Sequence, residues 1–395
     1  MNVMKRTLLI CGLGLSIPAV HAQETEVRYL SGTDAAHTVD WDFKVSDGRR
    51  SGVWTRIAVP SCWEQQGFGS YNYGRDYKTD GKNSRFADEK GSYRHRFKVP
   101  AQWKGRVISI VFEGSMTDTE VRINGKSAGP VHRGAFYRFR HDISELLKYG
   151  GDNLLEVEVS KMSSDPSVNN AERLADYWIF GGIFRPVWLE ASPTAHIAGL
   201  AVDATHDGKL TIEADLRGSL KVARLAWELT DPAGKVMIRK QVPVRPMDSL
   251  QRIEAIVPDV KPWTSETPAL YLLRVSLQDA AGRTVHSVRE RIGFRTVEIR
   301  RGQGVFVNGI QVKFKGVNRH CFWPETARTL SREQQEMDLR LLKEMNMNAV
   351  RCSHYPPDKY FLELCDSLGI FVINELAGWQ KAYSTNAGTP LVREM

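Results

Sequence analysis

The sequence predicts a multidomain β plus α/β fold: a jelly-roll β-sandwich, an immunoglobulin-like β-sandwich, and the first three βα units of a TIM barrel. Two observations predict the sandwiches, because residues 23–192 and then 193–295 alternate apolar and polar side chains in short runs separated by turn residues. A third predicts the barrel portion, because residues 296–395 alternate strand patterns with helical ones, which is typical of a parallel sheet. A chain of 395 residues is long enough for several such domains.

Residues 1–22 are expected to be a signal peptide and not part of the fold. Lys5 and Arg6 give a positive start, residues 8–20 are apolar, and residues 20–22 form a small-x-small cleavage site. We therefore expect a periplasmic or secreted protein that has no membrane contact once the signal is removed. After it, no run is long and apolar enough to cross a bilayer.

The composition excludes some classes of function. The formal net charge is +8, but the basic residues are scattered and no Lys/Arg run reaches five, so nucleic-acid binding is not expected. Four cysteines follow the signal segment, too few for a disulfide framework in so long a chain, although one bridge stays open. The oligomeric state also stays open.

In the first sandwich, residues 107–112 predict a buried strand. Residues 120–123 predict a strand that turns at Asn124-Gly125, because both positions tolerate positive φ. A turn at 150–153 precedes a strand at 154–159.

In the second sandwich, turns are expected at 231–234 and 279–282, where Asp and Gly cluster. The module is expected to be a spacer that lacks the immunoglobulin disulfide. Its predicted strands are residues 209–216, 223–230, 236–244, 270–277 and 284–292.

The third part is predicted to open with a hairpin across Asn308-Gly309. Ser331 and Gln334 form a capping box for a helix with Met337, Leu341 and Met345 on one face. A second helix is expected to start at Pro357, to turn Phe361, Leu364, Cys365 and Leu368 inward, and to end at Gly369. Strands are expected at residues 348–355 and 370–375 around that second helix.

Polar residues follow each predicted strand of the parallel sheet. The carboxyl ends of barrel strands build active sites, so we expect these side chains to surround one pocket. They are Asn318 with His320, Arg351 with His354, and Asn374 with Glu375.

Several stretches resemble glycoside hydrolase family 2, especially its β-galactosidases. The resemblance covers nearly the whole chain after the signal segment, in the family's domain order. It is carried by residues 60–64, 178–187, 263–271, 316–320, 348–356 and 364–372.

The resemblance implies a retaining hydrolase of terminal β-galactosides or related β-glycosides, with a carbohydrate as its substrate. It implies that His320 and His354 contact the substrate and that Arg351 positions the nucleophile. Asp176 falls where the family places an aspartate that binds a sugar hydroxyl, and Asn72 is aligned more loosely to a similar role. Asn318, Asn374 and Glu375 complete the expected substrate-binding set. Stacking on a sugar ring is an alternative role for Trp178, Trp323 and Trp379, which are expected to be core or wall residues.

The sequence departs from the family at two places. Residues 321–324 replace the Glu-His-His-Pro that often follows Asn-Arg-His, and residues 376–379 replace the sequence of the magnesium site. We therefore expect no cofactor, although magnesium or sodium occurs in the family. The departures also leave β-glucuronidase-like or β-mannosidase-like specificity open.

The resemblance also places the family's two catalytic carboxylates, on the fourth and seventh barrel strands. Residues 296–395 supply three of the eight strands. We therefore expect no catalytic residue within this chain, and we expect the acid/base and the nucleophile beyond Met395. We interpret the chain as a C-terminally truncated enzyme and Glu375 as a wall residue, while whether Met395 is the true C-terminus stays open.

Two other interpretations differ in the kind of site. A non-catalytic carbohydrate-binding protein or pseudo-enzyme is the alternative function. A zinc site from His320, Cys321, Cys352 and His354 is disfavoured, because alternate strand residues point to opposite faces.

From the truncated-enzyme interpretation we predict that purified 1–395 hydrolyses nitrophenyl glycosides no faster than buffer, because retention requires two carboxyls about 5 Å apart. Release of nitrophenol is the measurement. Robust turnover by the chain alone would overturn the interpretation.

Overall fold

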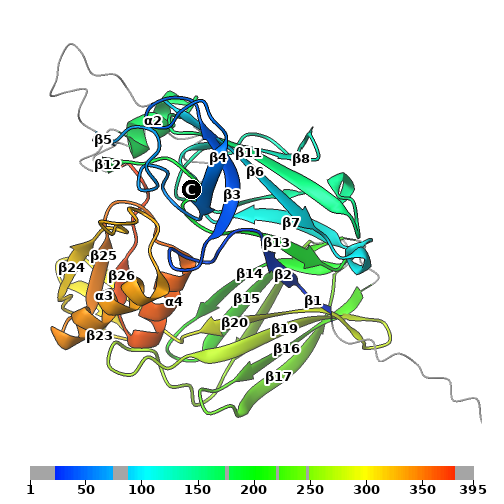
Figure 1. The fold of residues 1–395 in the computed structure, drawn as a ribbon. Coiled ribbons are helices and arrows are strands. Elements are labelled where there is room, and N and C mark those ends of the chain that lie inside the picture. The colour runs from blue at the N-terminus through cyan, green and yellow to red at the C-terminus, as the bar shows by residue number, and fades with distance from the viewer. Residues whose placement is uncertain (1–22, 74–87, 174–177, 219–221, 246–248, 379–395) are drawn as a thin grey trace, which may run out of the picture.

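The computed structural model describes residues 23–73, 88–173, 178–218, 222–245 and 249–378. They form two β-sandwiches and a smaller β/α portion that lies beside both (Figure 1). No helix in these ranges is long and apolar enough to cross a membrane. The predicted fold class, a jelly roll, an immunoglobulin-like sandwich and a partial barrel, is confirmed.

The first sandwich packs a six-stranded sheet against a four-stranded one. The larger sheet runs β4 (Thr55–Val59), β3 (Val39–Val45), β6 (Lys90–Lys98), β11 (Asp152–Ser160), β8 (Asp118–Ile123) and β9 (Lys126–Ser127). The smaller runs β10 (Phe139–Asp142), β7 (Val107–Phe112), β13 (Val187–Ser192) and β2 (Glu26–Tyr29). Short pieces complete the domain: 3-10 turns Ala101–Trp103 and Ser144–Leu146, helix α2 (Pro166–Glu172), and a ribbon of β5 (Asn72–Tyr73) with β12 (Trp178–Ile179).

Alternation along the strands produces the core of this sandwich. Trp41, Phe43 and Val45 of β3 are fully buried, whereas the residues between them face outward. The strand predicted at 107–112 has those bounds, and the predicted turn joins β8 to β9 with φ of 53° at Asn124 and 80° at Gly125. Both predictions are confirmed.

The second sandwich consists of a five-stranded and a three-stranded sheet. The first contains β1 (Gln23–Glu24), β20 (Thr284–Ile292), β19 (Tyr271–Asp279), β16 (Val222–Thr230) and β17 (Val236–Pro243). The second contains β14 (His196–Ala204), β15 (Lys209–Arg217) and β18 (Leu250–Ile256). All five predicted strands are present, and β14 and β18 were not predicted.

The short strand β1 belongs to a different sandwich from the one expected. Residues 23–24 were assigned to the first sandwich, but they pair in parallel with His286 and Ser287 of β20. Two residues carry no periodicity, so only this long-range pairing reveals where the strand lies.

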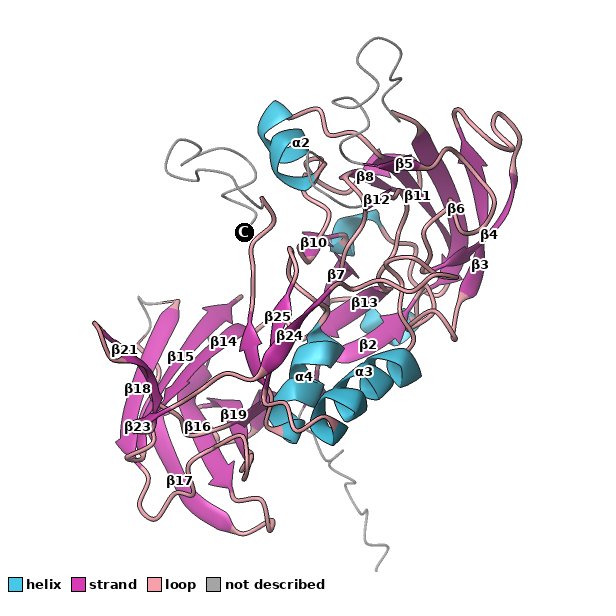
Figure 2. Ribbon diagram, turned by 90° about the vertical axis from the view of Figure 1, so that its left-hand side faces the viewer, coloured by secondary structure: helices cyan, strands magenta, loops and turns pink. Residues whose placement is uncertain are grey.

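The third portion begins with a small antiparallel sheet and continues as a parallel one. The antiparallel sheet is β21 (Val297–Arg300), β22 (Gly304–Val307) and β23 (Ile310–Gln311). The parallel order is β24 (Gly316–Arg319), β25 (Ala349–Cys352) and β26 (Phe371–Ile373), which confirms the predicted βα pattern. Helices α3 (Arg332–Glu344) and α4 (Lys359–Leu368) lie side by side along this sheet (Figure 2).

The predicted cap of α3 is confirmed, but the predicted face is wrong. The Ser331 side chain accepts from the Gln334 N–H, and the Gln334 side chain accepts from the Ser331 N–H. Leu341 and Met345 are 45% and 56% exposed, because Leu339 and Leu342 face α4 and the sheet instead. Both stripes fit a helical period, so the apolar pattern alone did not distinguish them.

Helix α4 begins two residues later than predicted. Asp358 is its N-cap and accepts from the Phe361 N–H, while Gly369 ends it with φ of 71°. Phe361 and Cys365 are buried as expected, but Leu368 is 37% exposed at the end of the helix.

An apolar cluster joins the first sandwich to the barrel portion. Phe136 from the sandwich stacks on Tyr355, with ring centroids 4.3 Å apart and an interplanar angle of 9°. Around this pair gather buried residues from both sides: Cys62, Met116, Phe180, Phe184, Cys321, Ala327, Leu330 and Ala377. We call these residues the shared core.

A buried histidine should make stability depend on pH. His286 is fully buried, its Nδ1 accepts from the Ile197 N–H at 3.1 Å, and burial lowers its pKa to about 4. Neutral His286 therefore stabilises the fold fully above its unfolded pKa near 6.5, and this contribution is lost as the pH falls from there toward 4.

We expect His286→Gln to remove on the order of 2 kcal/mol of this pH dependence between pH 7 and 4, measured by urea unfolding. His206→Gln is the control, since that ring bonds to Thr296 and is only partly buried. An unchanged slope for His286→Gln would contradict the assignment.

Candidate functional site

The ends of three parallel strands bring the predicted polar residues together. The register places Asn318 beside Arg351, and Arg351 beside Ile373, two residues before Glu375. Parallel strands end at one edge of a sheet, so the polar residues that follow them meet there.

Arg351 is the centre of this group. Its Nε donates to Glu375 Oε1, and one terminal nitrogen lies 3.4 Å from Asn318 Oδ1. His354 Nδ1 lies 3.0 Å from Glu375 Oε2 and 3.3 Å from the other terminal nitrogen of Arg351. Both oxygens of Glu375 are therefore engaged, and the guanidinium is held by three neighbours.

His320 completes the group from the end of β24. Its ring centroid lies 5.2 Å from that of His354 at an angle of 86°, and its Nδ1 lies 3.4 Å from the Tyr355 hydroxyl. Partial burial lowers the pKa of His320 to about 4, and nearby Arg328 contributes in the same direction. His320 is neutral at pH 7 and can both donate and accept hydrogen bonds.

Of the other predicted substrate-binding residues, Asn374 stands apart from this group, and the side chains of two more lie outside the described part of the chain. Asn374 follows β26 and is exposed, and within the described ranges it makes no bond to the others. Asp176 lies outside the described residues. Asn72 lies in β5 beside Ile179 of β12, but its side chain is also outside the described part.

The expectation about the catalytic carboxylates stays a prediction. It places the acid/base and the nucleophile beyond Met395, and the described residues end at 378, so both Trp379 and Met395 lie outside them. The described ranges contain three strands of the parallel sheet, β24, β25 and β26. Among the residues described at the ends of these strands, Glu375 is the one carboxylate, and Arg351 and His354 already engage it.

Aromatic side chains border the strand ends. Trp178 was expected in the core or wall and is 46% exposed, whereas Trp323 packs partly buried against the shared core. Tyr71 and Phe322 are 44% and 40% exposed near Trp178 and Phe180, and both were missed. Their places in the sequence, next to residues 72 and 321, were the only signal for them.

Arg328 was also missed. It lies over the Tyr355 ring at 4.4 Å and donates to the Trp178 carbonyl at 3.3 Å, so it touches both sides of the site. It sits in a loop between a strand and a helix, where no period marks it.

The cysteines do not form a bridge or a zinc site in the described part of the chain. Cys62, Cys321, Cys352 and Cys365 are free and buried. Arg319 donates to Cys321 Sγ at 3.2 Å, and burial raises the pKa of Cys352 to about 12. No three His, Cys, Asp or Glu side chains converge as ligands within the described ranges.

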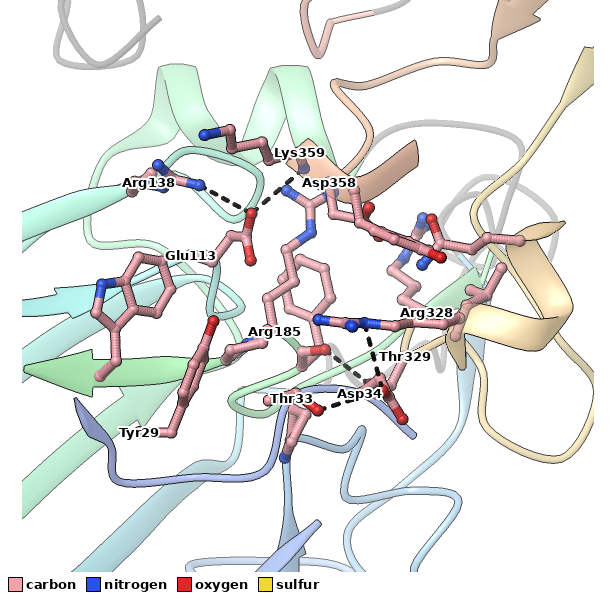
Figure 3. A pocket seen from close by; sticks show the side chains of 18 of the residues that line it. Tyr29, Thr33, Asp34, Glu113, Arg138, Arg185, Arg328, Thr329, Asp358 and Lys359 are labelled. Atoms are coloured by element: carbon pink, nitrogen blue, oxygen red, sulfur yellow. Dashed lines mark hydrogen bonds and ion pairs between the residues drawn. The ribbon is translucent and has the colours of Figure 1, made fainter. Parts of the chain in front are cut away.

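A separate cleft of about 330 Å³ lies between the first sandwich and helices α3 and α4 (Figure 3). Glu113 accepts from Arg138 at 3.0 Å and from the Lys359 N–H at 3.3 Å, and Asp34 lies 4.0 Å from Arg332. Glu113 and Asp34 of the first sandwich thus face Lys359 of α4 and Arg332 of α3, so we interpret the cleft as part of the domain interface.

Three sequence profiles of the glycosyl hydrolases of family 2 match consecutive parts of the chain. The sugar binding domain matches residues 34–193, the family 2 domain 195–295 and the TIM barrel domain 297–391.

Curated relatives carry the name β-galactosidase. One from Lactobacillus delbrueckii subsp. bulgaricus is 32% identical over 331 residues, covering 81% of this chain and 32% of the relative. One from Priestia megaterium is 32% identical over 343 residues, covering 82% and 32%. The chain thus spans about a third of the length of these relatives.

Solved structures share the fold. A β-glucuronidase from Bacteroides uniformis superposes with a TM-score of 0.75 at 23% identity, covering 94% of this chain and 45% of that one. A putative β-galactosidase from Bacteroides fragilis gives 0.71 at 23%, covering 89% and 53%.

The Phe136–Tyr355 stack should matter more for stability than the Tyr355 hydroxyl. We expect Phe136→Ala to lower the free energy of unfolding by about 3–5 kcal/mol, because it leaves a cavity in the shared core. Tyr355→Phe keeps the stack and should cost about 1 kcal/mol. Urea unfolding measures both, and equal costs would contradict this ranking.

Proposed function

Because the chain belongs to the glycosyl hydrolases of family 2, we propose that it forms the sugar-recognition part of a retaining β-galactosidase-like enzyme. The observation that carries the proposal is the convergence of Asn318, Arg351, His354 and Glu375 with His320 beside the first sandwich. Planar amide, guanidinium, imidazole and carboxylate groups match the hydroxyls of a sugar, and adjacent rings can stack on its apolar face.

The charges at the strand ends favour a neutral sugar. The Arg351 guanidinium is paired with Glu375, and His320 is neutral at pH 7. A glucuronide carboxylate would have to compete with Glu375 for Arg351, whereas an uncharged hydroxyl would not displace this ion pair. We therefore favour β-galactosides over β-glucuronides, in agreement with the names of the curated relatives.

In this proposal the described residues bind and orient the sugar. Retention requires one carboxyl as acid/base and another as nucleophile, about 5 Å apart. Glu375 is the single carboxylate among the described residues at these strand ends, and it is bonded to Arg351 and His354. We propose that hydrolysis depends on carboxylates from further barrel strands, beyond Met395, and that residues 1–395 alone are inactive.

We further propose that the protein acts in the periplasm or outside the cell. The support is the N-terminal pattern of Lys5, Arg6, an apolar stretch and a cleavage site at residues 20–22.

Binding titrations by ligand-observed NMR test the proposed function. We expect the protein to bind methyl β-galactoside more tightly than methyl β-glucuronide or methyl β-mannoside. His354→Ala should weaken galactoside binding about fivefold, because it removes the imidazole beside Glu375. This factor corresponds to the loss of roughly one hydrogen bond.

The matched control is His206→Ala, which changes a histidine in the second sandwich that bonds to Thr296. If methyl β-glucuronide bound more tightly than methyl β-galactoside, the substrate would be assigned as a β-glucuronide instead. If His354→Ala bound the galactoside as tightly as the unmodified protein, the sugar would not bind at the strand ends.

A further inference from the structure

A positive charge is buried inside the first sandwich, at the end of β11. Lys161 is fully buried, and its Nζ donates to Glu64 Oε1 and to the Ser70 carbonyl, each at 2.6 Å. Glu89 Oε1 lies 3.3 Å away. Burying an ammonium is costly unless such partners surround it, so this arrangement strongly restrains the groups that it touches.

Those partners hold both strands of the β5–β12 ribbon. Glu64 Oε1 accepts from the Gly181 N–H at 3.0 Å, and Gly181 follows β12 by two residues. Glu89 Oε1 accepts from the Ser70 N–H at 2.8 Å, and Ser70 precedes β5 by two residues. One buried charge cluster thus fastens the start of one strand and the end of the other.

The ribbon cannot hold this position by its own pairing. Its two strands have two residues each, and an isolated two-stranded ribbon is marginal in water even when it is longer. The Lys161 cluster supplies the charge-assisted hydrogen bonds that the short ladder lacks.

The ribbon is linked to the loop that follows β24 through Phe322 and Arg328. Tyr71 and Trp178 lie edge to face with ring centroids 5.9 Å apart. Phe180 stacks on Phe322 with ring centroids 6.2 Å apart, and Phe322 lies two residues after His320, which follows β24. Arg328 donates a hydrogen bond to the Trp178 carbonyl and lies over the ring of Tyr355, which stacks on Phe136 of the first sandwich. Figure 1 shows β5 and β12 on the side toward which the chain runs on leaving β26.

We propose that Lys161 is a positioning residue for sugar recognition. Through Glu64, Glu89 and the ribbon, it holds Tyr71 and Trp178 as an aromatic wall for the sugar bound at the strand ends. Lys161 itself does not touch the sugar. This inference rests on the proposed function, because it takes the strand ends to be the sugar site.

The test compares Lys161→Met with Lys90→Met. Lys90 pairs with Glu158 on the exposed face of the same sheet, so the control removes an ion pair that does not touch the ribbon. Glu89→Gln is a milder variant that keeps the Lys161–Glu64 pair, in case Lys161→Met does not fold. Hydrogen exchange at the Ser70 and Gly181 amides and methyl β-galactoside affinity are the two readouts.

We expect Lys161→Met to speed exchange at Ser70 and Gly181 while β7 stays protected, and to weaken galactoside binding about tenfold. Glu89→Gln should change both readouts in the same direction by less, and Lys90→Met should change neither. Fast exchange with unchanged affinity, or slow exchange with lost affinity, would overturn the positioning role. Absence of galactoside binding by the unmodified protein would instead refute the proposed function, and the exchange data would still report whether Lys161 holds the ribbon.

Discussion

The stack of Phe136 on Tyr355 is the contact on which the rest of the site depends. It lies in an apolar core that belongs to neither domain alone, and Tyr355 follows His354 directly. A shared core of this kind fixes two domains more firmly than a polar interface would, because separating them exposes apolar surface to water. The strand-end residues therefore face loops of the first sandwich at a fixed separation.

Buried and partly buried charged residues of the first sandwich and the barrel portion are arranged in pairs. Arg319 of β24 donates to Asp338 of α3 at 2.8 Å. Arg351 bonds to Glu375 at the strand ends, and Lys161 bonds to Glu64 inside the first sandwich. Arginine suits the two strand positions, since its planar guanidinium can bond to several neighbours at once. Lysine suits the interior of the sandwich, where one compact charge is surrounded by separate oxygens.

The sequence predicted the features that depend on nearby residues. The bounds of β7, the turn at Asn124, the cap at Ser331 and the parallel order of β24–β26 all follow from local period and turn chemistry. It could not predict pairings between distant segments, such as Lys161 with Glu64 or the ring contact of Tyr71 with Trp178. The buried face of α3 was missed for a related reason, because two stripes of similar apolarity competed and the position of α4 decided between them.

The bonding of Glu375 also limits what chemistry these strand ends can perform. A general acid must offer a proton to the leaving oxygen, and a nucleophile must present a free oxygen to the anomeric carbon. One Glu375 oxygen accepts from Arg351 and the other lies 3.0 Å from His354 Nδ1, so both oxygens already have a partner within the strand-end group. Holding Arg351 and His354 in a fixed geometry is the role that this arrangement supports. Under the proposed function, such a carboxylate organises the recognition of the sugar, and bond cleavage falls to carboxyl groups on further barrel strands.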